Sequence, residues 1–242
     1  MISIIIPTLD EEEGIAKTIC SIPEEIRKKS EIIAVDSSSD YTAIIAKKLG
    51  AKVIKEKKGK GRQMRRGVAE SKGDTLVFMD GDGTDPGEYI PKLLRKLERA
   101  DLVLGCRSLK HFKSDYPGMR QLFKFYRIFF VPPFRLVDFR VSDPLAGFRA
   151  IRRKDWDSLN LKSNTFEIET EMNIKAIKGG FIIKEVKIPH LKRCGGILKS
   201  KFGANPKMWF KIFRLFLKHC EDREIQEKIK EELKNIFFVQ KY

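Results

Sequence analysis

The sequence predicts an α/β fold in which a mostly parallel sheet carries helices on both faces. Over residues 1–110, short apolar runs alternate with segments whose apolar residues recur at helical spacing. This alternation is typical of parallel sheets, because each crossover between parallel strands needs a connection long enough for a helix. Apolar residues make up 42% of the 242 residues, which is enough for a sizeable core.

The individual elements follow from these patterns in chain order. We expect strands over residues 3–6, 31–35, 51–54, 75–79 and 102–104. We expect helices over residues 12–29, 43–49, 63–71 and 88–99. Pro23 should interrupt the first helix, because proline lacks a backbone N–H and clashes with the preceding turn. Gly50 and Gly73 follow two of the helices, as glycines that end helices commonly do.

The cysteine content and the apolar runs exclude several classes of protein. Four scattered cysteines without a Cys-x-x-Cys pair argue against a disulfide framework or a structural zinc site, and indicate a reducing compartment. No run approaches the ~18 apolar residues of a membrane-spanning helix. Pro7 ends the first apolar run too early for a secretion signal. We therefore expect a cytoplasmic protein.

The net charge of +16 is concentrated in the second part of the chain. Residues 1–110 hold 21 basic and 18 acidic side chains, a net of +3, whereas residues 111–242 hold 28 and 15, a net of +13. Such a one-sided excess favours an anionic partner: phosphate groups, nucleic acid or an acidic membrane surface. A heat-adapted surface rich in Lys and Glu would explain many charges of both signs, but not this excess.

Carboxylates follow several of the expected strands, at the edge where parallel sheets bind ligands. Asp36 follows the second strand, and Asp80 and Asp82 follow the fourth with one glycine between them. Residues two apart in an extended chain point the same way, so both carboxylates can converge on one cation. Such hard oxygen ligands suit Mg²⁺ or Mn²⁺. By its spacing alone an Asp-Gly-Asp segment is more often a turn, but its position after an apolar strand and opposite Asp36 favours the metal.

A series of motifs runs in order from residue 4 to about residue 201. They are P-T-L-D-E at 7–11, V-D-S-S-S-D at 35–40, G-K-G-R at 59–62, M-D-G-D-G-T at 79–84, G-C-R at 105–107, S-D-P-L-A-G-F-R at 142–149, E-T-E-M at 169–172, E-V-K-I-P at 185–189, and Arg193 with G-I-L-K-S-K at 196–201. Taken together, they resemble the family 2 glycosyltransferases. Within that family they look like the polyprenyl-phosphate sugar synthases, the branch that includes the dolichyl-phosphate mannose synthases.

The resemblance implies a GT-A fold, in which a Rossmann-like sheet binds a nucleotide sugar and a following part binds the acceptor. The nucleotide-sugar site that it implies consists of Pro7, Thr8, Glu11, Asp36, Lys60, Asp80, Asp82 and Arg107. In it, Asp36 would hydrogen-bond the base, Asp80 would face the ribose and the metal, and Asp82 would be the main ligand of Mg²⁺ or Mn²⁺. The groups implied for the diphosphate and the acceptor phosphate are Arg149, Arg193 and Lys201.

Two positions depart from the family pattern. Ser37 stands where a second Asp is common, which puts some ribose or base contacts in doubt. Thr84 stands where the synthases often carry Gln, which leaves the third metal ligand water-mediated or absent. The G-K-G at 59–61 occurs with UDP-glucose as readily as with GDP-mannose. We expect mannose as the donor sugar, with glucose as the second candidate. The sequence does not decide between them.

The implied reaction is the inverting transfer of a hexose to a dolichyl or other polyprenyl phosphate. Charge that develops on the leaving diphosphate would be stabilised by the metal and by Arg and Lys side chains. A phosphate monoester has a second pKa near ~6, so the acceptor is largely dianionic at neutral pH and needs no base. The catalytic candidates are Asp143 and Arg149. For Asp143, acceptor positioning or helix capping is as good an interpretation as base catalysis.

Two segments, 120–131 and 207–218, combine a basic stripe with a wide apolar face. This pattern is typical of helices that lie in a membrane surface, although either helix could pack on the core. We therefore expect peripheral binding to an anionic membrane surface, on its cytoplasmic face. The expected domains are a GT-A domain over 1–203, with a nucleotide-sugar half (1–110) and an acceptor half (111–203), and an amphipathic helical region over 204–242.

Two other functions stay open at this point. The same fold could transfer a sugar to a soluble phosphorylated acceptor such as phosphoglycerate, which would require no membrane. A basic nucleic-acid-binding module would also fit the charge of +16. However, no known nucleic-acid-binding motif is present and the expected ligand site is acidic, so we expect no nucleic-acid partner.

Overall fold

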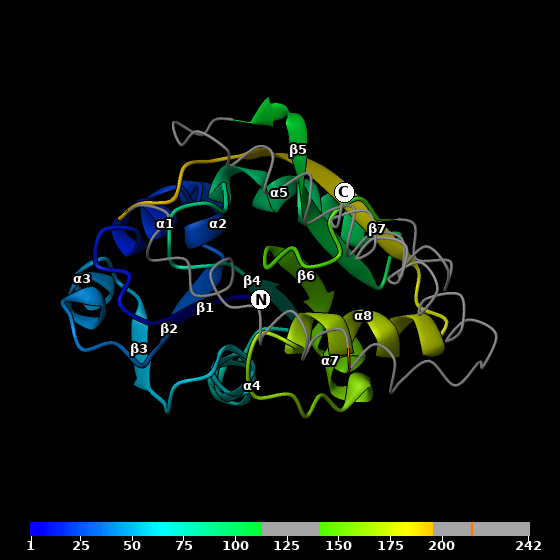
Figure 1. Ribbon diagram of the computed structural model, residues 1–242, viewed down its shortest axis with the longest axis horizontal. Helices are drawn as coiled ribbons and strands as arrows, with labels where there is room; N and C mark the ends of the chain where they lie inside the picture. The colour runs from blue at the N-terminus through cyan, green and yellow to red at the C-terminus, as the bar shows by residue number, and fades with distance from the viewer. Residues whose placement is uncertain (113–140, 196–213, 215–242) are drawn as a thin grey trace, which may run out of the picture.

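The computed structural model describes residues 1–112, residues 141–195 and Arg214. These residues form a seven-stranded sheet with helices on both faces (Figure 1). The strands are β1 (Ile2–Thr8), β2 (Ser30–Asp36), β3 (Lys52–Lys55), β4 (Thr75–Phe78), β5 (Leu102–Phe112), β6 (Arg149–Arg152) and β7 (Ile183–His190). They lie side by side in the order β3-β2-β1-β4-β6-β5-β7. The expected α/β fold is confirmed.

The direction of the strands places one further loop at the expected ligand edge. β1 to β4 pair in parallel, and β5 pairs in parallel with β7. β6 runs antiparallel to both β4 and β5. The five expected strands are present, but β6 and β7 were not expected and β5 extends beyond residue 104 to Phe112. Because β6 is reversed, the loop that precedes it reaches the same edge as the carboxyl end of β4.

The helices follow the expected order with local differences at their ends. They are α1 (Ile15–Cys20), α2 (Glu24–Arg27), α3 (Thr42–Lys48), α4 (Lys60–Glu70), α5 (Ile90–Leu97), α7 (Arg153–Leu159) and α8 (Ile168–Lys178), with a 3-10 turn at Gly87–Tyr89 before α5. Pro23 is the N-cap of α2, so the first helical segment is broken there as expected. α4 begins at Lys60 rather than at residue 63, which places Lys60 in its first turn.

The core consists of two apolar layers, one on each face of the sheet. Ile4 and Ile6 of β1 pack in the layer that also contains residues of α1, α2, α3 and α5. Ile5, which points the opposite way, packs in the layer with α4, α7 and α8. All three side chains are fully buried, and burial of a side chain of this size contributes roughly 1.5–3 kcal/mol. In Figure 1, α4, α7 and α8 lie below the sheet, with α1, α2 and α5 above it.

Several expectations concern parts of the chain outside the described residues. The segments 120–131 and 207–218 and Lys201 lie there, and the division into 1–110, 111–203 and 204–242 stays a prediction for the same reason. Among the described residues, no helix combines the length and the apolar character that a membrane crossing requires.

Candidate active site

Asp80, directly after β4, is held by Lys60 at the start of α4. Lys60 Nζ lies 2.6 Å from Asp80 Oδ1 and 2.5 Å from Glu169 Oε1 of α8. Burial alone would lower the pKa of Lys60, but Asp80 and Glu169 raise it above its ordinary value. Burial alone would raise the pKa of Asp80, but Lys60 lowers it. Both groups are therefore charged, and the Asp80 side chain stays 35% exposed at the sheet edge.

The two glycines around Lys60 allow this arrangement. Gly59 has a φ of 142°, which a residue with a side chain rarely adopts. A Cβ atom at Gly59 would collide with the carbonyl oxygen of Asn164, and one at Gly61 would collide with that of Ser163. The G-K-G segment therefore lets the start of α4 pack directly against the backbone at 163–164. This contact brings Lys60 next to α8.

Asp82 is hydrogen-bonded on both of its carboxylate oxygens. Thr84 donates its backbone N–H at 3.0 Å and its hydroxyl at 2.6 Å to Oδ1. Arg193 donates to Asp82 Oδ2 at 2.5 Å and to Glu11 Oε1 at 2.5 Å. Burial alone would lower the pKa of Arg193, but Asp82 and Glu11 raise it. Arg193, in the segment after β7, thus bridges the loops that follow β1 and β4.

The loop after β4 concentrates negative charge. Asp85 accepts a hydrogen bond from the backbone N–H of Asp80 at 2.7 Å. Burial and the neighbouring charge of Asp80 raise the pKa of Asp85 well above its ordinary value. Within the described residues, no three His, Cys, Asp or Glu side chains form a complete metal site. Mg²⁺ commonly takes only one or two carboxylates and completes its shell with water and substrate phosphates. The carboxylates of Asp80 and Asp82 are of the chemical type that suits such a cation.

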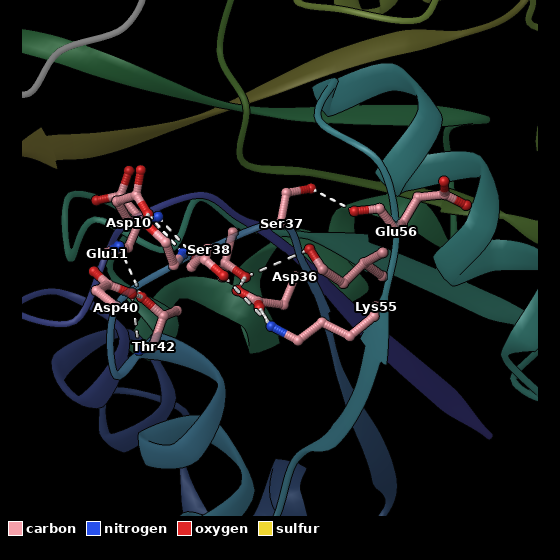
Figure 2. Close-up of polar contacts among 12 residues, drawn as sticks. Asp10, Glu11, Asp36, Ser37, Ser38, Asp40, Thr42, Lys55 and Glu56 are labelled. Atoms are coloured by element: carbon pink, nitrogen blue, oxygen red, sulfur yellow. Dashed lines mark hydrogen bonds and ion pairs between the residues drawn. The ribbon is translucent and has the colours of Figure 1, made fainter.

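Asp36, the last residue of β2, forms a second polar group on the same edge (Figure 2). Its fully buried carboxylate accepts from Thr8 Oγ1 at 2.9 Å through Oδ1. Oδ2 lies 2.5 Å from Nζ of Lys55, the last residue of β3, whose side chain is 66% exposed. Ser37 donates its hydroxyl to the carbonyl oxygen of Glu56 at 2.8 Å, so this position supports the chain after β3.

Asp143, the candidate base, is paired with Arg107 of β5. Arg107 Nε donates to Asp143 Oδ2 at 2.6 Å, and its NH2 group donates to Oδ1 at 3.0 Å. The Asp143 side chain is fully buried. Two parallel bonds of this kind fix both the position and the plane of a guanidinium group. The geometry is that of a carboxylate that positions an arginine.

The position of Arg149, the first residue of β6, does not suit a contact with a phosphate. Its side chain is fully buried and donates to the Ala146 carbonyl at 3.0 Å and to Asn173 Oδ1 at 3.2 Å. Asn173 in turn donates to the carbonyl oxygen of Pro144 at 2.5 Å. Burial lowers the pKa of Arg149. In this structure, Arg149 therefore holds the loop at 143–147 against α8, which differs from the role expected from the sequence.

The expected site residues thus fall into distinct groups. The edge cluster consists of Glu11, Lys60, Asp80, Asp82 and Arg193. Thr8 and Asp36 lie next to it on neighbouring strands, and Pro7 is part of β1 in register with Val35. The sequence interpretation missed Glu169 and Lys55. Glu169 belongs to the E-T-E-M motif, which was a usable signal, but nothing in the sequence distinguishes Lys55 from the other lysines.

A family model described as Glycosyl transferase family 2 matches residues 3–159. The chain is 30% identical over 222 residues to a dolichyl-phosphate hexose transferase of Haloferax volcanii, an alignment that covers 89% of this chain and 94% of the relative. It is 32% identical over 199 residues to a dolichol-phosphate mannosyltransferase of Pyrococcus furiosus, which covers 78% of this chain but 55% of that relative. The chain thus spans about half the length of the Pyrococcus enzyme.

Among solved structures, the fold is similar to glucosyl-3-phosphoglycerate synthase from Mycobacterium tuberculosis in complex with Mn²⁺, UDP and glucosyl-3-phosphoglycerate. The TM-score is 0.74 at 26% identity, and the match covers 91% of this chain and 80% of that one. The expected GT-A, Rossmann-like architecture is confirmed. With the family match over more than half of its length, this chain is a glycosyltransferase and belongs to the glycosyl transferase family 2.

Proposed function

We propose that this glycosyltransferase moves a hexose from a nucleotide-diphosphate sugar to a dolichyl or other polyprenyl phosphate, with Mg²⁺ or Mn²⁺ as cofactor. The names of its relatives support a lipid-phosphate acceptor, because they include a dolichyl-phosphate hexose transferase and a dolichol-phosphate mannosyltransferase. These names give both an unspecified hexose and mannose, so we propose the sugar only as a hexose. We place the reaction at the cytoplasmic face of a membrane.

The observation that carries the proposal is the edge cluster of Glu11, Lys60, Asp80, Asp82 and Arg193. It combines carboxylates, which suit a divalent cation, with an arginine and a lysine, which suit a diphosphate. Arg193 and Lys60 are both engaged with carboxylates in the described structure. A metal-bound diphosphate would replace these internal pairs with equivalent ones, so little charge would be left uncompensated.

Each group in the cluster has a role in the proposed reaction. The acceptor phosphate oxygen forms a bond to the anomeric carbon as the bond from that carbon to the diphosphate oxygen breaks, and the diphosphate leaves with the electron pair. When bound, Mg²⁺ or Mn²⁺ would neutralise charge on this leaving group. Asp80 and Asp82 would hold the cation, and Arg193 would turn from Asp82 to the diphosphate. Arg107, oriented by Asp143, would hold the acceptor phosphate rather than the nucleotide sugar to which the sequence assigned it.

A soluble phosphorylated acceptor is the second candidate. The structural likeness to glucosyl-3-phosphoglycerate synthase supports it, since that protein was crystallised with a phosphoglycerate product and Mn²⁺. Both reactions would use the same edge cluster, so only the acceptor distinguishes them. The net charge of +13 in residues 111–242 suits either an anionic membrane surface or a small acidic acceptor.

The experiment is an incubation of the protein with Mg²⁺ or Mn²⁺, a short polyprenyl phosphate and a panel of labelled nucleotide sugars. We expect labelled hexose in the organic extract with at least one donor, and none when the metal is chelated. Absence of lipid-linked product with every donor, from a protein that binds nucleotides, would reject the proposed acceptor.

A further inference from the structure

The loop after β4 carries both aspartates of the edge cluster, and we call its residues 80–85 the aspartate loop. It contains two glycines, Gly81 and Gly83, and Gly83 has a φ of 77°. A glycine-rich loop has many conformations open to it, so contacts from other elements must fix the positions of its carboxylates. Helix α1 supplies such contacts through one hydroxyl group and one glycine.

The hydroxyl group of Thr18 in α1 is bonded to the aspartate loop at two points. It accepts a hydrogen bond from the backbone N–H of Gly83 at 3.0 Å and donates one to the carbonyl oxygen of Asp80 at 3.2 Å. A hydroxyl group has one donor and two acceptor sites, so one side chain can make both bonds. Asp82 lies between the two bonded residues in the chain, and Thr18 is fully buried. The hydroxyl therefore holds together the two ends of the segment that presents Asp82.

Gly14, directly before α1, lets the helix approach this segment closely. A Cβ atom at Gly14 would lie 2.6 Å from the backbone carbonyl carbon of Asp82 and 2.7 Å from the carbonyl oxygen of Gly81. The φ of Gly14 is −105°, which any residue adopts, so the glycine is required here for space and not for conformation. Gly14 and Thr18 are four positions apart and therefore lie on one face of the helix. This face of α1 contacts the aspartate loop at both places.

We propose that Thr18 is a positioning residue that sets the separation of the Asp80 and Asp82 carboxylates for the divalent cation, an inference that rests on the proposed function. Groups that hold the ligands of a metal ion in place affect its affinity strongly, although they do not touch it. Thr18 acts through the backbone, because both of its hydrogen bonds are to main-chain groups of the aspartate loop. Loss of the hydroxyl leaves the buried N–H of Gly83 without this partner, so we expect the loop to rearrange.

Ser21, three positions further along α1, provides a comparison on the same helix. Its hydroxyl donates to the carbonyl oxygen of Thr18 at 2.8 Å and accepts the backbone N–H of Gly87 at 2.9 Å. This contact has the same chemistry as that of Thr18, but Gly87 lies outside the aspartate loop, in the 3-10 turn before α5. Removal of either hydroxyl should therefore cost a similar amount of stability. Only the loss of the Thr18 hydroxyl should release the residues proposed to hold the cation.

The test is the affinity of the whole protein for Mn²⁺ in the presence of a nucleoside diphosphate, measured by electron paramagnetic resonance of the free ion. UDP and GDP are used in separate titrations. Thr18→Val has nearly the same shape and lacks the hydroxyl, so we expect the Kd of Mn²⁺ to rise at least roughly tenfold. Thr18→Ser keeps the hydroxyl and should restore the affinity. Ser21→Ala is the matched control and should leave the Kd unchanged.

Steady-state kinetics give a readout that a smaller amount of folded protein would not change. In Thr18→Val, the Mn²⁺ concentration at half-maximal rate should rise at least roughly tenfold, while the KM for the polyprenyl phosphate stays the same. Gly14→Ala is an independent second variant, because its Cβ atom would collide with the backbone of Asp82. We expect it to weaken Mn²⁺ binding as well. Thermal melting of each variant checks that it is folded.

The possible outcomes separate this inference from the proposed function. An unchanged Kd of Mn²⁺ in folded Thr18→Val would overturn the role of Thr18, as would an equal loss in Ser21→Ala or no recovery in Thr18→Ser. If Thr18→Val does not fold, Gly14→Ala decides: weaker Mn²⁺ binding supports the positioning role of this face of α1, and a normal Kd overturns it. Failure of the unsubstituted protein to bind Mn²⁺ with either nucleotide would overturn the proposed function and this inference with it.

Discussion

At the scale of single residues, two acidic side chains of the edge cluster are each paired with a cation from another element. Asp82 pairs with Arg193 from the segment after β7, and Asp80 pairs with Lys60 from α4. Removing one member of such a pair leaves the other partly buried and uncompensated, which costs more than the pair itself contributes. These pairs hold the carboxylates in place before any ligand arrives.

Asp82→Asn should abolish metal-dependent transfer, with a loss of at least roughly 100-fold in kcat. The amide keeps the shape and the hydrogen bonds from Thr84 but removes the charge that binds the cation. Initial rates against Mn²⁺ concentration, together with a melting curve, measure the effect. The control is Asp74→Asn, because the Asp74 side chain is 89% exposed and forms an ion pair with the N-terminus, away from the edge cluster. Near-normal rates in a folded Asp82→Asn protein would contradict the assignment of Asp82 to the metal.

Arg193→Ala should lower kcat/KM at least roughly tenfold, because charge-assisted contacts strengthen as charge develops on the leaving diphosphate. It also leaves Glu11 and Asp82 facing each other without a cation. Steady-state kinetics with a nucleotide sugar measure the loss. Lys187→Ala removes an exposed cation of β7 and should change kcat/KM little. Equal kinetics in both variants would place the diphosphate site elsewhere.

At the scale of elements, the contact between α4 and the backbone at 163–164 positions Lys60. Gly61→Ala should lower the free energy of unfolding by roughly 1–3 kcal/mol and also reduce kcat/KM at least tenfold, because the new Cβ meets the Ser163 carbonyl. Gly50→Ala is the matched control: Gly50 has a φ of 85° but an open Cβ position. It should cost about 1 kcal/mol in stability and leave kcat/KM unchanged. Chemical denaturation measures the free energy of unfolding of both variants, and steady-state kinetics measure their kcat/KM. A loss of kcat/KM in Gly61→Ala alone assigns the effect to the geometry of the site rather than to backbone strain.

The end of β7 should make stability depend on pH. Burial and the nearby charge of Arg107 lower the pKa of His190 from 6.5 to about 4. Between these two values, the unfolded chain binds a proton that the folded chain does not, so stability falls as the pH falls from 6.5 to 4. The loss from this residue is at most roughly 3 kcal/mol. Urea denaturation of His190→Gln should show a smaller decrease over that range than the unsubstituted protein, and equal decreases would contradict the assignment.

The elements that the sequence predicted are those with a continuous local pattern. Strands of the first 110 residues appear as apolar runs, and the break at Pro23 follows from the chemistry of one residue. β6 was not predicted from the sequence, because it has only four residues and begins with a buried arginine. No local pattern indicates a strand there. Its reversed direction depends on pairing with β4 and β5, which is a property of the assembled sheet.

The candidate site was predictable to a similar extent. The position of Asp36, Asp80 and Asp82 follows from the ends of strands, because parallel strands bring their carboxyl ends to one edge. Arg193, the cation that pairs with Asp82, comes from a distant part of the chain, 111 positions away. Such a pairing requires the whole fold, as does the burial of Arg149, for which the family resemblance implied a phosphate contact.

At the scale of the whole molecule, the sheet places the groups proposed for the nucleotide sugar and for the acceptor on adjoining parts of one edge. Asp36 is the last residue of β2, and the edge cluster spans the loops after β1, β4 and β7 and the start of α4. Arg107 on β5 lies on the far side of β6 from β4. This order predicts a donor bound over β2 to β4 and an acceptor phosphate beyond it, toward β5. The same arrangement serves a lipid-linked or a soluble acceptor, so acceptor choice is the property on which the proposed function depends most.

The most direct test is a competition between the two acceptors in one vessel. A short polyprenyl phosphate and phosphoglycerate are supplied at equal concentration with Mn²⁺ and a labelled nucleotide hexose, and the label is partitioned between organic and aqueous phases. We expect the lipid phosphate to take up at least roughly tenfold more hexose, and chelation of the metal to abolish the transfer. Label that accumulates on phosphoglycerate instead would contradict the account and assign the edge cluster to a soluble acceptor.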